Sequence, residues 1–363
     1  MLQEARQDII GGSQGDRMRV MFQSRPDILR IPAGDTVQLL ETKQNLERLG
    51  VVVDHCTDLA PYLGEHDIVH LFNVTRIAET YVQCENAARQ GKPVALSTIY
   101  WNMEEYMLRT EGKHAGDLLR WWREDNRLRR EVLMRAAVLL PNAEAEMRLI
   151  QRDFGIEAHY RVIPNGADPE FARADPNEFL AQFGPGFGCQ DFVLSVGRIC
   201  PRKNQLSLIR AMRGTGIPLI LIGPVNDPFY FEECKREAEE HVVFLTHMPH
   251  SKLASAYRAA KVHVLPSWYD TPGLASLEAA MAGCNIVSTD RGTAKEYFQE
   301  FAWYCDPGDF RSIREAVTSA YEAGRRPELQ AMVMQKYTWE IAARKTREAY
   351  REVLGIGGPR RWD

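Results

Sequence analysis

Two acidic residues, Asp270 and Glu278, are candidates for chemistry because of the segment in which they lie. From position 274 to position 282 the only polar residues are Ser276 and Glu278. A helix that is apolar nearly all round is buried, and a carboxylate on it is costly unless something specific pairs with it. Asp270 precedes this segment in a loop. The pattern therefore predicts two carboxylates near the start of a buried helix.

The helix has recognisable start and stop signals. Thr271 is the predicted N-cap, Pro272 the first helical residue, and Gly283 the residue after the last turn. Predicted strands flank it at residues 263–265 and 285–288. The first amides of a helix have no partner within it and form the positive end of its dipole, so they suit an anion. Two carboxylates beside an anion site indicate a ligand with both hydroxyls and phosphate, as in a nucleotide sugar.

Each carboxylate also has a purely structural interpretation. An acidic residue in the first two turns of a helix often only complements the helix dipole, and Glu278 fits that description. Asp270 fits the description of a loop cap. The functional interpretation therefore depends on which other residues converge on the same place.

Two cations follow another predicted strand, residues 191–197. Arg198 comes directly after Gly197, and Lys203 lies five residues later, ahead of a predicted helix. Arg can hold a diphosphate through two parallel hydrogen bonds, while Lys acts as a point charge. Basic residues near a helix start are more often simply solvated, so this signal is weak by itself.

Length and composition are those of an ordinary globular protein with two domains. The chain has 363 residues, of which 45% are hydrophobic and 26% charged, and its formal net charge is −4. This balance does not indicate nucleic acid as a partner. The seven cysteines are scattered without a Cys-x-x-Cys pair, which favours reduced thiols in a cytoplasmic protein. The first residues carry no signal-peptide core.

Short apolar runs alternate with segments of helical length, which predicts βαβ units and parallel sheets. The predicted strands of the first half are 19–23, 51–55, 67–72, 93–98 and 136–140. Those of the second half are 191–197, 218–223, 241–246, 261–266, 284–289 and 301–305. The predicted organisation is a tail at 1–17, Rossmann-like domains at 18–166 and 167–337, a helix at 338–354 and a tail at 355–363. Two such domains form a cleft between the carboxyl ends of their strands.

Several segments resemble glycosyltransferase family 4, whose members have the GT-B fold of two facing Rossmann-like domains. The segments are VIPNGADPEFA, GRICPRKNQLSLIRAM, VVFLTHMPHSKLASAYRAAKVHVLPS, PSWYDTPGLASLEAAMAGCNIVSTDRGTAKEYF and YTWEIAARKTREAYREVL. The resemblance is specific over about 160–355 and looser over 18–160. It implies a retaining transfer of sugar from a nucleoside-diphosphate donor bound to the second domain. It also implies that the helix at 338–354 packs back onto the first domain.

The resemblance assigns roles to individual residues. Arg198 and Lys203 hold the donor diphosphate, Asp270 faces the donor sugar and Glu278 binds the ribose; the first three are the implied catalytic residues. The other implied donor contacts are Gly34, Gly197, Thr271, Pro272, Gly273 and Leu274, with His247 and Met248 near the base.

The sequence departs from the family pattern at four places. The first acid is Asp270 instead of Glu, so its carboxylate is one methylene shorter. The family's Gly-Phe-Gly loop is Thr-Pro-Gly at 271–273, and its later glycine pair is Gly292-Thr293. The segment IPAGDT has one glycine, Gly34, where the family has two. The family's histidine after the 93–98 strand is replaced by Tyr100 or Trp101.

The first domain is predicted to bind the acceptor through side chains at the ends of two strands. The candidates are His70, Asn73, Tyr100, Trp101 and Asn102. Aromatic faces with neighbouring amides commonly bind sugars, although a Tyr-Trp pair at a strand end is equally often part of the core. A lone histidine such as His70 is more often structural than catalytic.

Residues 118–135 combine Trp121 and Trp122 with several arginines. Such a segment could rest on an anionic membrane surface, where lipid-linked acceptors reside. Acidic residues interrupt the basic ones, however, and the favoured interpretation is a solvated amphipathic helix with both tryptophans facing the core.

The residues and the resemblance together predict a metal-independent glycosyltransferase that acts on saccharide or lipid-linked acceptors in cell-surface polysaccharide or glycoconjugate synthesis. That the transfer retains the anomeric configuration is implied by the resemblance alone. The chain has no Asp-x-Asp motif, so the cations and the helix N-terminus must meet the diphosphate charge. No cofactor is expected beyond the co-substrate, with a UDP-sugar favoured over a GDP-sugar. Two alternatives stay open. They are a sugar-nucleotide 2-epimerase on the same fold, and a nucleotide-sugar binding protein without turnover.

Overall fold

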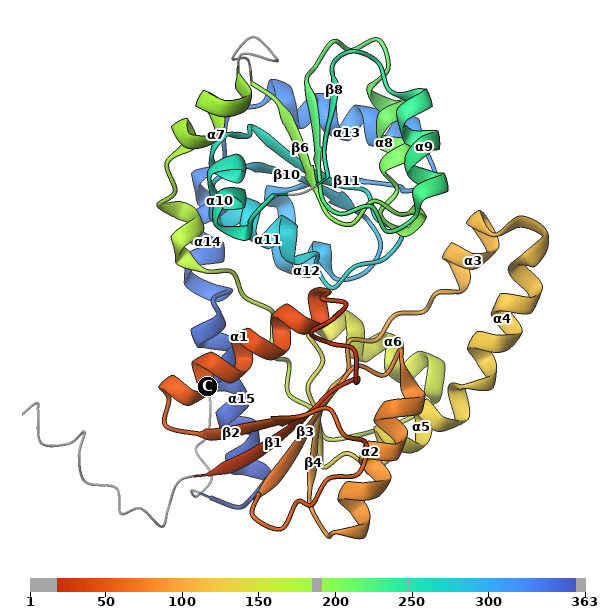
Figure 1. The fold of residues 1–363 in the computed structure, drawn as a ribbon, viewed down its shortest axis with the longest axis vertical. Helices are drawn as coiled ribbons and strands as arrows, with labels where there is room; N and C mark the ends of the chain where they lie inside the picture. Colours follow the sequence, from red (N-terminus) through yellow and green to blue (C-terminus); the bar gives the residue numbers. More distant parts are fainter. Residues whose placement is uncertain (1–17, 185–190, 247, 357–363) are drawn as a thin grey trace, which may run out of the picture.

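A computed structural model describes residues 18–184, 191–246 and 248–356 of the chain. Within these residues two domains, each built on one parallel sheet, face each other (Figure 1). The prediction of an α/β protein with two Rossmann-like domains is confirmed. The predicted tail at 1–17 and the candidate residue His247 lie outside the described residues, as does most of the predicted tail at 355–363.

The first sheet has the strand order β2-β1-β3-β4-β5, and all neighbouring strands are parallel. Its strands are β1 (Arg19–Gln23), β2 (Val52–Cys56), β3 (Ile68–Phe72), β4 (Val94–Ser97) and β5 (Val138–Leu139). The side chains of β3 are all buried, because helices cover both faces of the sheet (Figure 1). The strand order reverses between β1 and β3, which is where open parallel sheets bind ligands.

The second sheet has the order β11-β10-β9-β6-β7-β8 and is also parallel throughout. Its strands are β6 (Val193–Val196), β7 (Leu219–Ile222), β8 (Val242–Leu245), β9 (Val262–Leu265), β10 (Asn285–Thr289) and β11 (Trp303–Cys305). Here the order reverses between β6 and β9. The loops that follow these two strands carry Lys203 and Asp270, so the topology itself brings two predicted site residues together.

Helices connect the strands and cover the sheets. The first domain contains α1 (Gly34–Arg48), α2 (Ile77–Arg89), α3 (Glu104–Thr110), α4 (Ala115–Glu124), α5 (Asn126–Arg135) and α6 (Glu144–Phe154). The second contains α7 (Pro176–Phe183), α8 (Gln205–Met212), α9 (Pro228–Glu237), α10 (His250–Ala259), α11 (Leu274–Met281), α12 (Ala294–Phe298), α13 (Phe310–Glu322) and α14 (Pro327–Lys336). Among the described residues, no helix is long and apolar enough to cross a membrane.

The last helix, α15 (Trp339–Val353), packs into the first domain although it follows the second in sequence. Its buried residues recur at helical spacing and are Trp339, Ala342, Ala343, Thr346, Ala349 and Tyr350. All of them except Thr346 share a hydrophobic cluster with Val20 of β1 and Leu39 of α1, and α15 runs along α1 in Figure 1. The apolar stripe of α15 therefore completes the core of the first domain.

The chain crosses between the domains twice, and the two crossings lie side by side. The amide of Ala167 donates to the carbonyl oxygen of Tyr337 at 2.9 Å. Gly166 lies so close to the second crossing that a Cβ on it would be 2.3 Å from the backbone nitrogen of Trp339. A glycine is therefore required at this position for the two crossings to pack together.

The single amphipathic helix predicted at 118–135 is divided in the structure into two helices that meet at Asp125. The cause is a buried arginine. Arg129 donates to the carbonyl oxygen of Trp122 at 2.6 Å, and its guanidinium lies 3.7 Å from the centre of a Trp122 ring. A side chain thus satisfies a carbonyl in the last turn of α4, which sequence periodicity does not reveal.

Replacing Gly166 by Ala should lower the free energy of unfolding by about 1–3 kcal/mol, because the added methyl group meets backbone atoms that cannot rotate away. Urea denaturation measures the change. Gly116→Ala is the matched control: this glycine lies in α4 with open space around its Cβ position, so Ala should be neutral or stabilising there. Equal effects of the two substitutions would contradict the close packing of the crossings.

Candidate active site

The two domains meet at the carboxyl ends of their strands. The N-termini of α1 and α11 approach each other there, since a Cβ on Gly34 would lie 3.9 Å from Cδ1 of Leu274. Leu274 packs partly against the core cluster of the first domain. The predicted donor residues Gly34 and Leu274 thus come together although they lie far apart in sequence. We call this place, where the loops after the strands of the two sheets meet, the crevice.

On the side of the second domain, a largely buried ion pair joins the loops after β6 and β9. Nζ of Lys203 is 2.6 Å from Oδ2 of Asp270, and Nη1 of Arg202 is 3.4 Å from Oδ1 of the same carboxylate. Arg202 also donates to the carbonyl oxygen of Tyr269 at 3.1 Å and lies over the Tyr269 ring. The sequence predicted Lys203 and Asp270 for this place. Arg202 was missed, because a basic residue beside another is not distinctive in sequence.

The loops are held together by Asn204, which makes the ion pair possible. Asn204 has a left-handed backbone with φ of 64°, a conformation that asparagine tolerates better than most residues. Its side-chain amide donates to the carbonyl oxygens of Pro266 at 3.1 Å and Pro307 at 2.8 Å. The loop after β6 is thereby fixed against the loop after β9.

The electrostatics of this cluster are unbalanced. Burial alone would raise the pKa of Asp270, but the nearby Lys203 and Arg202 hold that pKa below its usual value, so the carboxylate is ionised at neutral pH. Among the described residues, Asp270 is the one carboxylate that bonds either cation. The predicted diphosphate ligand Arg198 is half-buried beside them and makes no side-chain hydrogen bond within the described part of the chain. The crevice therefore carries an excess of positive charge.

Helix α11 begins two residues later than predicted. Gly273, not Thr271, is the N-cap, and Leu274, not Pro272, is the first helical residue. Gly273 has φ of 86°, and a Cβ there would lie 2.7 Å from Cδ2 of Leu265, so only glycine fits. The Thr-Pro start signal misled because residues 271–272 continue the loop. The carbonyl oxygen of Thr271 accepts from Nδ2 of Asn165 at 3.0 Å, which ties this loop to the crossing segment.

Glu278 lies in the second turn of α11 and is half-buried. Its Oε2 accepts a hydrogen bond of 3.0 Å from the hydroxyl of Tyr257, a fully buried residue of α10. This contact fixes the carboxylate at the side of the helix that faces α10 and the loop before it. Met248, the described half of the predicted base contact, lies in that loop and packs against the core cluster of the domain. The structure thus supplies Glu278 with a positioning partner that the sequence did not predict.

Trp101 enters the same crevice from the first domain. A Cβ on Gly292 would lie 2.6 Å from Cη2 of Trp101 and 2.7 Å from the carbonyl oxygen of Asp270. The indole therefore lies against the backbone of Gly292 and close to that of Asp270, both in the second domain, and its centroid is 6.2 Å from that of the Tyr269 ring. Gly292 has φ of 76°, so both its conformation and its crowding require glycine.

Two predicted acceptor residues are corrected by the structure. His70 is buried, with Nδ1 at 2.5 Å from the hydroxyl of Tyr350 and Nε2 at 2.9 Å from Oγ of Ser97. Burial lowers its pKa to about 3, so the ring is neutral and structural. Tyr100 is also buried, and its hydroxyl donates to Asp153 at 2.8 Å. Both side chains point into the core, where their partners lie on α15 and α6. The sequence did not reveal this orientation, because these partners are distant along the chain.

The two predicted asparagines have local roles. Oδ1 of Asn102 accepts from the amide of Glu104 at the start of α3, and its Nδ2 donates to Asp153 at 2.9 Å. Asn73 follows β3 with φ of 77° and donates to Asp35 at 3.4 Å. Asp35 in turn receives two hydrogen bonds from Arg25. Asn73 therefore stays at the switch point of the first sheet, next to the N-terminus of α1.

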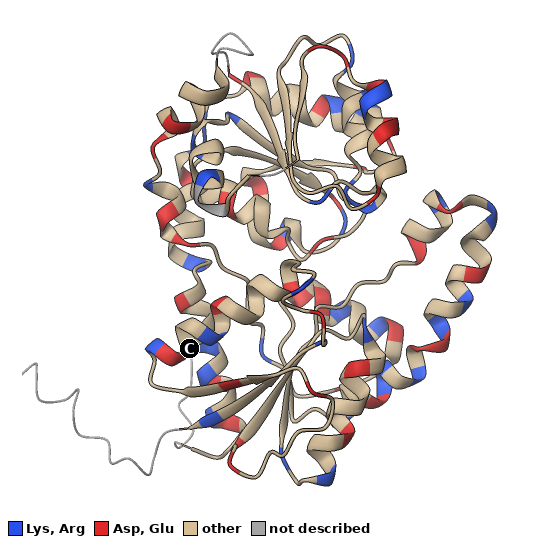
Figure 2. Ribbon diagram, viewed as in Figure 1, with Lys and Arg blue, Asp and Glu red and all other residues tan. Residues whose placement is uncertain are grey.

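The tryptophan pair at 121–122 is divided between surface and core. Trp122 is buried as predicted, but Trp121 is 57% exposed, which corrects the prediction for that residue. The ribbon in Figure 2 shows acidic residues interspersed among basic ones along α4 and α5.

Polar contacts join the domains around the crevice. The carboxylate of Glu296 accepts from the amides of Glu144 at 2.9 Å and Ala145 at 3.0 Å, and so caps α6 from the other domain. Arg291 forms an ion pair with Glu105 of α3 at 2.8 Å. These contacts hold the two domains in the arrangement that brings Trp101 to Gly292.

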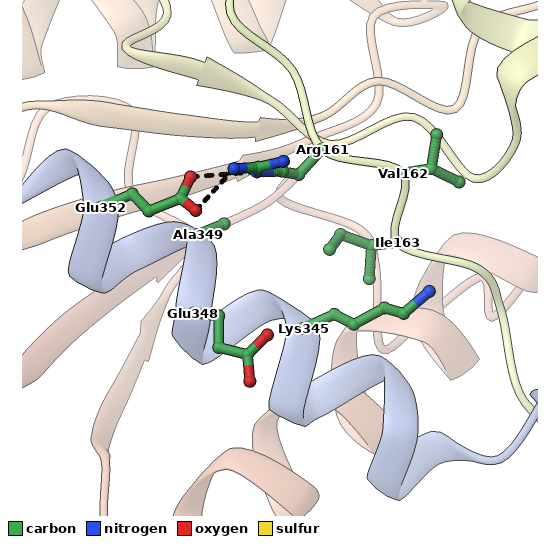
Figure 3. A pocket seen from close by; sticks show the side chains of 7 residues that line it. All are labelled: Arg161, Val162, Ile163, Lys345, Glu348, Ala349 and Glu352. Atoms are coloured by element: carbon green, nitrogen blue, oxygen red, sulfur yellow. Dashed lines mark hydrogen bonds and ion pairs between the residues drawn. The ribbon is translucent and has the colours of Figure 1, made fainter. Parts of the chain in front are cut away.

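A cavity of about 420 Å³ lies between α15 and residues 161–163 (Figure 3). Arg161 and Glu352 form an ion pair of 2.7 Å at one end, while Lys345 and Glu348 extend from α15 at the other. The two positive and two negative side chains that line this cavity cancel in charge, whereas the crevice carries an excess of positive charge. Within the described residues, no group of three or more His, Cys, Asp or Glu side chains is arranged to hold a metal ion.

Comparison with protein families finds a match that includes the loops carrying Lys203 and Asp270. Residues 183–338 match the family described as glycosyl transferases group 1. This match covers less than half of the chain, and it shows that these residues are similar to group 1 glycosyltransferase domains. An uncharacterised glycosyltransferase from Methanocaldococcus jannaschii is 28% identical over 228 residues, which are 56% of this chain and 56% of that protein. The chain spans about half the length of the curated relatives it matches.

Solved structures match over nearly the whole chain. Sucrose-phosphate synthase from Thermosynechococcus elongatus has a TM-score of 0.77 at 18% identity, covering 94% of this chain and 100% of that one. The Anabaena protein HepE in complex with UDP-glucose has a TM-score of 0.72 at 16% identity, covering 93% and 100%. These matches confirm the predicted GT-B fold.

Replacing Asp270 by Asn should lower the free energy of unfolding by about 3 kcal/mol, because Lys203 and Arg202 lose their buried counter-ion. Added pyrophosphate should raise the melting temperature of the variant more than that of the wild type, since it replaces the missing charge. Differential scanning fluorimetry and urea denaturation measure both effects.

Asp191→Asn is the matched control, because Asp191 pairs with Lys261 at an exposed site where an ion pair contributes at most about 1 kcal/mol. If Asp270→Asn were as stable as wild type, Asp270 would not be the counter-ion of this cluster.

Proposed function

We propose that the protein is a glycosyltransferase that moves a sugar from a nucleoside-diphosphate sugar to an acceptor hydroxyl. The observation that carries the proposal is the positive crevice at the switch point of the second sheet. Three cations, Arg198, Arg202 and Lys203, gather there around one carboxylate. Buried charge of one sign is unfavourable unless a ligand supplies the other, so the crevice favours a dianionic or more highly charged group.

The chemistry proposed for the crevice is departure of the diphosphate with stabilisation by fixed cations. Arg198 is available for two parallel hydrogen bonds to phosphate oxygens, and Lys203 can turn from Asp270 to a phosphate. The free amides at the start of α11 add positive potential. Because these groups meet the charge that develops on the leaving group, the transfer is proposed to need no metal ion.

In the same proposal, Asp270 accepts hydrogen bonds from hydroxyls of the donor sugar once Lys203 has turned to the phosphate. The acceptor hydroxyl then attacks from the face that the diphosphate leaves, and a phosphate oxygen takes its proton, which retains the anomeric configuration. Glu278, held by Tyr257, is placed to accept hydrogen bonds from the ribose hydroxyls. We infer a UDP-sugar in preference to a GDP-sugar, which is supported by the fold shared with a protein solved with UDP-glucose.

The acceptor is proposed to be a saccharide, free or lipid-linked, that enters from the side of the first domain in the synthesis of a cell-surface polysaccharide or glycoconjugate. Trp101 is the one predicted acceptor residue whose ring reaches the crevice among those described. Exposed Trp121, with basic residues around it on α4, supports a peripheral contact of a cytoplasmic enzyme with the membrane surface.

The direct test is incubation with a panel of UDP- and GDP-sugars, with EDTA and without an acceptor, followed by chromatography of the nucleotides. Slow release of UDP or GDP from one donor, insensitive to EDTA, is expected. Conversion of the donor into its 2-epimer would contradict a transferase, and binding of donors without any release would indicate a binding protein.

Replacing Arg198 by Ala should weaken binding of UDP by about ten- to a hundredfold and leave binding of uridine unchanged, because a charge-assisted hydrogen bond contributes about 1.5–3 kcal/mol. Isothermal titration calorimetry measures both. Arg236→Ala, which removes the same charge from an exposed position on α9, is the control and should bind UDP normally. Unchanged affinity of Arg198→Ala for UDP would remove Arg198 from the site.

Replacing Glu278 by Gln should sharply weaken binding of both UDP and uridine, since a neutral amide is a poorer acceptor for ribose hydroxyls. Tyr257→Phe should produce a smaller loss, because it removes the hydrogen bond that orients the carboxylate. If Glu278 only complemented the helix dipole, Gln would cost at most about 1 kcal/mol of stability and leave both affinities alone.

A further inference from the structure

The loop between β4 and α3 contains a strained residue. Ile99 has φ of 45°, which places a β-branched side chain in the left-handed region. Such a conformation costs on the order of 1–3 kcal/mol and persists only where surrounding contacts impose it. Glu146 makes the contacts that impose this conformation, and the strained loop positions Trp101.

A fully buried carboxylate holds the strained turn on both sides. Glu146 of α6 is 0% exposed. Its Oε1 accepts from the hydroxyl of Thr98 and, at 2.8 Å, from the amide of Tyr100, the two residues that flank Ile99. Its Oε2 accepts from the amide of Asn142 at 2.7 Å. One carboxylate thus fixes three donors, two of which bracket the strained residue.

Keeping this carboxylate buried is costly. Burial raises the pKa of Glu146 to about 7, well above the usual value of a glutamate, despite its three hydrogen bonds. An apolar side chain of similar size would fill the space without that cost, but it would leave two backbone amides and a hydroxyl unpaired. The need to pair these three donors explains why a carboxylate is present. By accepting from residues 98 and 100, the carboxylate fixes the backbone conformation of residues 98–100.

The strained loop delivers Trp101 to the crevice. The indole is 6% exposed and lies against Gly292 and close to the carbonyl oxygen of Asp270. Gly292 leaves no room for movement, because even a Cβ at that position would overlap the ring. A shift of the backbone at Ile99 would therefore move the indole either into Gly292 or out of the crevice.

We propose that Trp101 limits the size of the donor sugar, and that Glu146 is a positioning residue that holds Trp101 in place through the strained turn at Ile99. The inference rests on the proposed function, in which Asp270 faces the donor sugar. Because the indole occupies space next to the backbone of Asp270, the site is proposed to take a compact sugar, a pentose or an unsubstituted hexose, and to discriminate against an N-acetylhexosamine. A pocket wall of this kind separates substrates by about ten- to two-hundredfold per small group.

The test compares the affinities of UDP, UDP-xylose, UDP-glucose and UDP-N-acetylglucosamine for wild type, Trp101→Ala and Trp101→Phe by calorimetry. Wild type should bind UDP-xylose or UDP-glucose at least tenfold more tightly than UDP-N-acetylglucosamine. Trp101→Ala should reduce this ratio about tenfold with UDP affinity within twofold of wild type, and Trp101→Phe should retain most of it. An unchanged ratio in Trp101→Ala would overturn the proposal.

Glu146→Gln and Ile99→Gly test the positioning role. Gln places a donor opposite the amide of Asn142, and Gly relaxes the turn, so both should reduce the sugar ratio in the direction of Trp101→Ala. Ile99→Gly is informative even if Glu146→Gln folds poorly, because glycine tolerates the native φ, so the fold is kept, but its backbone freedom no longer fixes the turn. If both variants keep the wild-type ratio, Glu146 is only structural and the proposal fails. Absence of UDP binding by the wild type would instead overturn the proposed function.

Discussion

The contact of Asp270 with Lys203 and Arg202 places two positive charges and one negative charge in a crevice largely closed to water. Each of these groups loses hydration on burial, and one carboxylate cannot compensate two cations fully. With Arg198 beside them, the free energy of the empty crevice is raised relative to a state in which an anion is bound. Anion binding is therefore favoured before any specific hydrogen bond to a ligand is considered, and the loops of both domains are arranged around this imbalance.

The fold supplies the loops and the domain contacts bring them together. Each sheet reverses its strand order at one point, and the residues that follow those strands meet in the same crevice. The joining contacts are polar: Glu296 caps α6, and Arg291 pairs with Glu105. Polar interfaces within a chain commonly permit relative movement of domains. The paired crossings at Ala167 and Tyr337 are the place where such movement is least free.

Much of this arrangement could be predicted from the sequence. Alternating apolar runs predicted both sheets, and the loop positions of Lys203 and Asp270 predicted their meeting, because parallel strands present their carboxyl ends at one edge. The orientation of His70 and Tyr100 could not be predicted, because side chains at a strand end point to either face and their partners are distant in sequence. Arg202 carried no distinguishing pattern. The start of α11 was misplaced because Thr-Pro serves a loop as well as a helix cap.

The central claim is that excess positive charge in the crevice selects a diphosphate. Titration calorimetry of the wild type with uridine, UMP and UDP, at low and at high salt, tests it most directly. Affinity should rise steeply from uridine through UMP to UDP, and the advantage of UDP should fall as salt increases, because ions screen the attraction. Equal affinities for uridine and UDP, or an advantage of UDP that is independent of salt, would contradict this account of the crevice.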